Sequence, residues 1–280
     1  MVGRGWLSAT PPAARLTAGA LFLLGLTGTL GCSQPIGRQP LAGACTPFTL
    51  VASEPAGGAQ KVPLDAAVSL TFSDFPNPAT ATLDSVKLSS GALTGFGGFE
   101  VDLITRSIRF RNRYWLWPDL TYLVTVLPAL ESLTGCAAKA EQLSFHTGDG
   151  PSDPPVPARA TPAFADILPI FAAHCGGATC HRPSPGEAGC LATPAKGLSL
   201  CDADAWASLI DVDATELGAM KRVVPGDASR SYLMRKLIPG DPAGGPLPTT
   251  PGHRDPPDLP PLDDVDLRAL SDWIDGGAAR

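Results

Sequence analysis

The placement of proline is the feature that most limits how this chain can fold. Residues 148–162 read GDGPSDPPVPARATP, and such a run can neither continue a helix nor take a place inside a sheet. A second polar, proline-containing stretch covers residues 33–44. Both have the composition of semi-rigid linkers. Since 280 residues are enough for two ordinary domains, we predict one domain between the linkers and another after the second.

The first 31 residues have the pattern of an export signal. Arg4 and Arg15 give a positive start, and the apolar run over 16–30 is too short to span a bilayer comfortably. Cys32 follows Gly31 directly, which resembles the lipobox of bacterial lipoproteins. That resemblance implies that Cys32 is acylated and anchors the chain to a membrane of the bacterial envelope, in the periplasm or at the outer membrane. The alternative is an ordinary secretory signal with Cys32 as an odd thiol.

The segment between the linkers is predicted to be a β domain. It contains short runs rich in Val, Leu, Ile, Thr and Phe, at 48–52, 67–72, 85–88, 99–104, 107–111, 121–127 and 142–147. Turn signals such as Asn77-Pro78 and Gly97-Gly98 separate them. About seven short strands with regular turns favour a two-sheet sandwich.

Several motifs of this segment resemble the Ig-like domain of bacterial surface-layer and envelope proteins. The matching stretches are 54–58, 62–65, 116–122 and 145–148. The resemblance covers nearly all of residues 46–149 and implies a sandwich fold with a spacer or adhesion role, not a chemistry.

Helical signals dominate the final segment. Apolar residues recur at helical spacing after Pro162, and Pro169 is expected to kink or restart that helix. Asp202 and Asp227 are candidate helix caps. The clearest helix begins at Asp263, buries Leu267, Leu270, Trp273 and Ile274, and ends at Gly276.

The strongest chemical signal is the group Cys175, Cys180 and His181. Two thiols followed at once by a histidine are typical of covalent haem attachment, in which the thiols form thioethers and the histidine binds the iron. The usual spacing is C-x-x-C-H, and this chain has two extra residues between the cysteines.

Together with its surroundings, this group resembles a class I cytochrome c module of bacterial envelope proteins. The matching stretches are 167–171, 197–200, 223–227, 231–237 and 270–278. The resemblance implies an all-α cytochrome c-like domain over 163–280, with one haem c attached to Cys175 and Cys180 and ligated by His181. Related modules carry a Met-Pro ligand loop, in which this chain has Leu247-Pro248.

The sixth iron ligand therefore stays open. His253, Met234 and Met220 are candidates, and without any of them the iron would keep an open face suited to small ligands or peroxidase-type chemistry. His174 is expected to cap a helix end rather than bind metal, and His146 to be an exposed strand residue.

Two other readings compete with haem at the cysteine pair. A Cys175–Cys180 disulfide would leave His181 free, and a zinc ion would need Cys190 or Cys201 to complete a Cys₃His set. If the first two cysteines hold haem, the economical disulfides are Cys45–Cys136 and Cys190–Cys201, as expected outside the cytoplasm.

Composition excludes several classes of function. The chain is acidic, with a net charge of −6 and no basic stretch, which argues against nucleic acid as a partner. It has no phosphate-binding loop and no G-x-S-x-G turn, and its loop acids lack the spacing of a calcium-binding EF-hand.

We therefore expect a domain order of signal peptide (1–31), tether (32–45), Ig-like β-sandwich (46–149), linker (150–162) and cytochrome c-like helical domain (163–280). The expected function is single-electron transfer by an envelope-anchored haem lipoprotein with a redox protein partner, not an enzyme. The alternative is a structural or binding envelope lipoprotein that has lost haem and carries disulfides.

Overall fold

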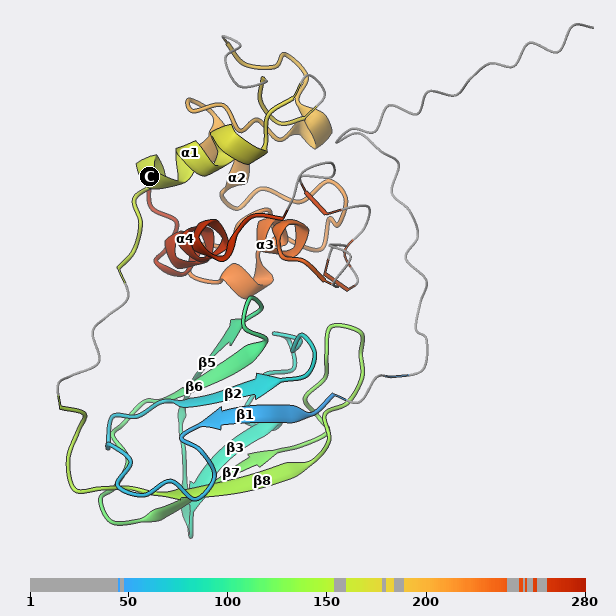
Figure 1. Cartoon of the computed structure of the whole chain (residues 1–280). Coiled ribbons are helices and arrows are strands. Elements are labelled where there is room, and N and C mark those ends of the chain that lie inside the picture. Colours follow the sequence, from blue (N-terminus) through green and yellow to red (C-terminus); the bar gives the residue numbers. More distant parts are fainter. Residues whose placement is uncertain are drawn as a thin grey trace, which may run out of the picture.

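The computed structural model describes residues 45, 48–153, 160–177, 180–183, 189–240, 247–248, 250, 254–255 and 261–280. Signal peptide, Cys32, most of the tether and His253 lie outside the described residues. Figure 1 shows a β part built from the first half of the described chain and a part with short helices built from the second.

Two four-stranded antiparallel sheets make up the β part. The first has the order β1 (Leu50–Glu54), β2 (Val68–Phe72), β6 (Ser107–Asn112) and β5 (Gly97–Asp102). The second has the order β4 (Leu93–Thr94), β3 (Val86–Ser90), β7 (Thr121–Val126) and β8 (Glu141–His146). The prediction of a two-sheet sandwich is confirmed.

Alternating side chains explain how the two sheets face each other. In β2 the residues Val68, Leu70 and Phe72 are buried while the two between them are partly exposed. This follows from the two-residue period of a strand, which sends every second side chain into the core. Cys45 and Cys136 close the sandwich with a disulfide whose Cα atoms lie 5.4 Å apart, as the sequence analysis expected.

The second part contains four short α-helices and two 3₁₀ turns. They are α1 (Phe164–His174), η1 (Ala195–Gly197), α2 (Ala205–Leu209), η2 (Ala228–Arg230), α3 (Tyr232–Leu237) and α4 (Asp264–Asp275). Among the described residues, none of the helices is long and apolar enough to cross a membrane.

The prediction of an all-α cytochrome c-like domain over 163–280 is wrong. Only α1 and α4 exceed six residues, and most of the chain between them has no regular structure. Proline limits α3, which ends at Leu237, one residue before Pro239-Gly240. The apolar periodicity identified individual helical turns but overestimated how far they extend.

The ends of the second part are held together by α1 and α4. Trp273 is fully buried, its ring centroid lies 5.3 Å from that of Phe164, and its Nε1 donates to the carbonyl of Ala279 at 2.8 Å. Asp263 caps α4 as predicted, since its carboxylate accepts from the backbone N–H of Asp266 at 2.8 Å. Pro169 does not interrupt α1, which runs through it as one helix.

Sandwich and helical part share a hydrophobic core. Phe75, Leu103 and Leu133 of the sandwich belong to the same buried cluster as the residues of α1, α3 and α4. Beside this cluster Arg268 of α4 donates to Asp102 at the end of β5 at 2.8 Å, and both side chains are about a quarter exposed. The two parts therefore pack directly against each other.

We predict that Trp273→Ala lowers the free energy of unfolding by about 3–5 kcal/mol, because it leaves a cavity between α1 and α4. Urea unfolding followed by intrinsic fluorescence and circular dichroism measures the change. Val265→Ala in the same helix is the control, since Val265 is 75% exposed, and it should cost well under about 1 kcal/mol. Equal effects of the two substitutions would contradict the proposed role of Trp273.

Candidate functional site

The loop that follows α1 brings Cys175 and His181 together. Cys175 is the last residue of the helix turn, with its N–H donating to the carbonyl of Phe171 at 3.0 Å. The chain then turns back, and the N–H of Gly177 donates to the carbonyl of Arg182 at 2.9 Å. Gly177 has a φ of +148°, a conformation that side chains with a Cβ rarely adopt. This turn folds the motif into a closed loop.

His181 is held in one orientation. Its side chain is buried, and its Nδ1 lies 3.2 Å from the carbonyl oxygen of Leu198, which makes Nδ1 the protonated nitrogen. The backbone of Ala195 also interacts with the ring. Burial lowers the pKa of His181, and the nearby charge of Asp255 opposes this only in part. The imidazole is thus neutral, with a lone pair on Nε2.

Cys175 carries a free thiol beside this imidazole. Burial is the main reason that its pKa rises to about 12, and the negative charge of Asp255 adds to the effect. Cys180, in contrast, is disulfide-bonded, and no Cys175–Cys180 bond forms. The two cysteines of the motif therefore differ in chemical state.

A small cavity of about 60 Å³ borders both Cys175 and His181. One part of its wall is aliphatic, formed by Leu198, Leu200, Leu209, Leu233 and Leu237. The other part is charged, formed by Lys196, Glu216, Arg222, Lys236 and Asp255. A thiol and an imidazole between an apolar and a charged wall suit a ligand with one apolar and one polar end.

The charged wall is centred on a buried lysine. Nζ of Lys236 lies 3.3 Å from Glu216 and 3.9 Å from Asp255, and only 6% of the Lys236 side chain is exposed. The hydroxyl of Tyr232 donates to Glu216 at 2.9 Å. Burial and the charge of Glu216 raise the pKa of Tyr232, so its hydroxyl stays protonated.

The group of Tyr232, Glu216, Lys236 and Asp255 was not predicted from the sequence. Tyr232 and Lys236 are four residues apart and share one face of α3. This spacing was the one sequence pattern that could have linked the two residues. Glu216 and Asp255 come from distant segments, and no local pattern connects them to that face.

Arg222 fixes the irregular chain around the cavity. Its guanidinium donates to the carbonyls of Lys196, Gly197 and Ser208 at 2.8–3.2 Å. Lys196 and Gly197 end η1 and Ser208 lies in the last turn of α2, where carbonyls lack helical partners, so the Arg222 side chain replaces missing backbone hydrogen bonds.

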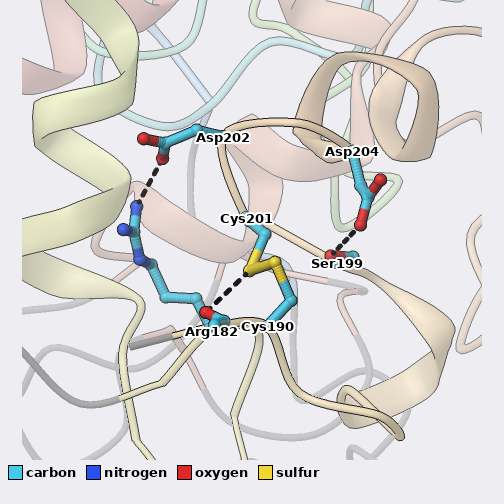
Figure 2. Close-up of a disulfide and its surroundings, with 7 residues drawn as sticks. Arg182, Cys190, Ser199, Cys201, Asp202 and Asp204 are labelled. Atoms are coloured by element: carbon cyan, nitrogen blue, oxygen red, sulfur yellow. Dashed lines mark hydrogen bonds and ion pairs between the residues drawn. A yellow bond between two sulfur atoms is a disulfide. The ribbon is translucent and has the colours of Figure 1, made fainter. Parts of the chain in front are cut away.

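A second disulfide closes the chain next to the motif. Cys190 and Cys201 are joined with Cα atoms 5.8 Å apart, as expected, and neither is a thiolate that could complete a zinc site. Figure 2 shows this bond between the Arg182–Asp202 ion pair at 3.3 Å and the hydrogen bond from Ser199 to Asp204 at 3.4 Å. Asp202 pairs with Arg182 and caps no helix.

The other candidate ligands lie away from the cavity. Met234 is buried in the hydrophobic core, and Leu247 is fully buried in that same core. Nε2 of His174 lies 3.2 Å from Asp266 of α4, and His146 contacts Asp119 at 3.0 Å on the sandwich. The described residues contain no cluster of three or more His, Cys, Asp or Glu side chains suited to a metal ion.

The residues present fit haem c only in part. His181 has a ring fixed through Nδ1, as iron ligands do, and Cys175 is a free thiol at the cavity wall. Cys180 does not line the cavity and its sulfur is already bonded. One of the two thioether positions is therefore missing in this arrangement.

Comparison with known proteins identifies the first part only. Residues 44–147 match the family model of the bacterial Ig-like domain, which confirms the Ig-like resemblance for the sandwich. A search of curated proteins found no match.

Solved structures resemble the chain weakly. The surface-layer protein SbsC is 16% identical over 41% of this chain and 15% of its own, with a TM-score of 0.31. The copper resistance protein PcoC from Escherichia coli is 16% identical over 36% of this chain and 99% of its own, also with a TM-score of 0.31. The chain thus spans a small fraction of the SbsC structure, and scores this low carry no functional argument.

We predict that the Cys175 thiol resists alkylation in the native protein at pH 8, because a pKa of about 12 leaves almost no thiolate. Iodoacetamide labelling with peptide mapping should find Cys175 unmodified before, and modified after, unfolding in guanidinium. Labelling of native Cys175 at the rate of the unfolded chain would contradict a raised pKa of this thiol.

We also predict that Lys236→Met destabilises the fold by about 3–5 kcal/mol, because it leaves Glu216 buried without its cation. Lys221→Met is the matched control, since Lys221 pairs with Asp213 at 2.6 Å on the surface and should cost less than about 1 kcal/mol. Chemical denaturation of both variants measures the two losses of unfolding free energy. Similar losses would contradict the expectation that the buried Lys236–Glu216 pair matters more than the exposed Lys221–Asp213 pair.

Proposed function

We propose that this chain is an exported binding protein of the bacterial cell envelope, in which the Ig-like sandwich is a spacer and the second part holds a small ligand. The observation that carries this proposal is the cavity beside Cys175 and His181, which lies outside the Ig-like match. Two disulfides support an oxidising compartment outside the cytoplasm. The Ig-like match supports a location at or beyond the cell surface.

Attachment to the membrane through Cys32 belongs to this proposal as well. Its support is the apolar run over 16–30 followed by Gly31-Cys32. Packing of the sandwich against the second part through Leu103 and Arg268 would hold the cavity in a fixed position relative to the sandwich.

The chemistry of the cavity selects the kind of ligand. Its leucine wall favours a flat or aliphatic apolar body, and Lys236 and Arg222 favour an acidic end. Nε2 of His181 adds an acceptor for a hydrogen-bond donor or for a metal carried by the ligand. Burial raises the pKa of the Cys175 thiol to about 12, which disfavours the reactive thiolate, so we propose binding rather than catalysis.

Haem is the second candidate ligand, with single-electron transfer as the function. The favouring observation is the fixed His181 ring, whose Nδ1 is hydrogen-bonded to the carbonyl of Leu198. His181 would hold the iron and Cys175 would attach one vinyl group, while Lys236 and Arg222 would pair with acidic groups. When bound, haem supplies a one-electron redox couple, and an open iron face would also allow peroxidase-type chemistry.

One experiment tests the binding proposal and ranks the two ligands. The full exported chain is produced with and without a cytochrome maturation system and examined by intact mass and visible absorption. We predict a colourless protein in both cases that binds anilinonaphthalene sulfonate, an apolar anion, at one site. Thr215→Trp at the exposed rim of the cavity should weaken this binding at least about tenfold.

Val265→Trp is the control, because it adds the same indole on the exposed face of α4 and should leave binding unchanged. A covalent haem band that disappears in Cys175→Ser and changes its spectrum in His181→Ala would favour the second candidate. Absence of single-site binding of both the dye and haem would overturn the proposal.

A further inference from the structure

Large exposed aromatic side chains gather at one end of the sandwich. Phe96, Tyr114, Trp115 and Trp117 are each between 62% and 69% exposed. All four lie in two connections, the one between β4 and β5 and the one between β6 and β7. Exposed apolar side chains that occur together mark an interaction surface, whereas single ones are ordinary. These four residues form the aromatic end of the sandwich.

The two connections lie side by side. Oδ1 of Asn112, at the end of β6, accepts from the N–H of Phe96 at 2.8 Å. The N–H of Arg113 donates to the carbonyl of Phe96, and Gly97 at the start of β5 pairs with Asn112 in the sheet. The connection that carries Phe96 therefore contacts the start of the loop that carries the other three rings.

The aromatic end lies away from the second part of the molecule. Leu103, directly after β5, belongs to the core that the sandwich shares with the second part. Phe96 lies directly before β5, so the whole length of this strand separates Phe96 from that core. Figure 1 shows the turn between β5 and β6 next to the helical part. A partner can therefore reach the rings without displacing the second part.

Polar side chains of the sandwich fix the backbone that carries the rings. The amide nitrogen of Asn112 donates to the carbonyl of Tyr114 at 2.8 Å, and the hydroxyl of Thr147 donates to the carbonyl of Trp117 at 2.7 Å. The N–H of Trp117 donates to the hydroxyl of Tyr122 at 2.9 Å. A fixed backbone lowers the entropy cost of binding. The same bonds use polar groups that could otherwise bind the hydroxyls of a glycan or the amides of a peptide.

Charge does not select the partner of the aromatic end. The loop between β6 and β7 contains one cation, Arg113, and one anion, Asp119. The guanidinium carbon of Arg113 lies 5.9 Å from the centroid of the Tyr114 ring, and the carboxylate of Asp119 contacts His146 at 3.0 Å. The two formal charges of the loop cancel, so attraction to a partner has to come from the rings.

The interface of a lipid bilayer is the partner that suits such a surface. Tryptophan and tyrosine have an apolar body and a polar edge, and both are enriched at the depth of the lipid headgroups. A layer of headgroups adapts to exposed rings, whereas a specific protein or glycan requires polar groups in matching positions. Because the polar groups beside the rings hold the loop, the aromatic end offers rings and few such positions.

The tether is long enough for this arrangement. Cys45 is bonded to Cys136 in the connection between β7 and β8, which also carries Leu133 of the shared core. Cys45 therefore lies at the end of the sandwich next to the second part. The twelve residues 33–44 can span at most about 40 Å, whereas the six residues of β7 cover about 20 Å. The anchor proposed at Cys32 and the aromatic end can thus reach the same bilayer.

We propose that the aromatic end rests in the headgroup layer of a lipid bilayer and orients the sandwich on it. The four rings move part of their apolar surface out of water, which is a driving force without directional demands. The second part lies at the opposite end of the sandwich and then projects away from the bilayer. This role does not depend on what the cavity beside His181 holds.

The test measures co-sedimentation of the full exported chain with phosphatidylcholine vesicles. Every variant also carries Cys32→Ser, so that acyl chains do not contribute to binding. We expect the partition coefficient to fall at least about tenfold in the double variant Trp115→Ala, Trp117→Ala. Since the rings rather than charges drive binding, it should change less than about twofold between low and physiological salt.

Val265 provides the matched controls, because it is the exposed apolar residue of α4, in the second part. Val265→Ala should leave vesicle binding unchanged. Adding Val265→Trp to the double variant returns one exposed indole at a different place, and it should not restore binding. Circular dichroism and dye binding at the His181 cavity confirm that each variant is folded.

Three results with vesicles would overturn the proposal: no binding before the tryptophans are changed, an equal loss in Val265→Ala, and recovery of binding with Val265→Trp. Self-association in the ultracentrifuge, or binding of neutral dextran, that is tighter than vesicle binding and lost in the double variant would assign the rings to a second copy or to a glycan instead. Absence of vesicle binding with the dye site intact would reject this proposal alone and leave the function proposed above standing.

Discussion

The packing of α1 against α4 is the contact on which the second part of the molecule depends. Phe164 and Trp273 lie at opposite ends of this part in sequence, and their rings meet in its core. Between these helices the described residues form only short elements, namely η1, α2, η2 and α3. Burial of one large aromatic pair and the three hydrogen bonds of Arg222 hold the loops that form the cavity.

The sandwich contributes side chains to the hydrophobic core of the second part. Phe75, Leu103 and Leu133 extend from it into the core of the helical part, and Arg268 adds an ion pair with Asp102 at the boundary. A shared core of this kind favours movement of the two parts as one body. The Ig-like sandwich can therefore act as a rigid support for the part that holds the cavity.

Sequence patterns predicted the features that rest on local periodicity. The alternation of Val68, Leu70 and Phe72 correctly predicted a strand of the sandwich. The cap at Asp263 and the apolar stripe with Trp273 correctly predicted the last helix, because both signals lie within a few residues of each other. The all-α domain was wrong because separate helical turns do not reveal how much irregular chain lies between them. The buried ion pairs of Lys236 were not predicted, because its partners Glu216 and Asp255 are distant in sequence and only the tertiary fold brings them close.

The loop after α1 presents a neutral, fixed imidazole to a cavity with one leucine-rich and one charged wall. Nitrogen chemical shifts of His181 in the ligand-free chain, followed by NMR over a range of pH, test it most directly. The account predicts protonated Nδ1, unprotonated Nε2 and a pKa below the ordinary value, because burial disfavours the imidazolium. A ring that titrates at the ordinary pKa, or one with its proton on Nε2, would contradict it.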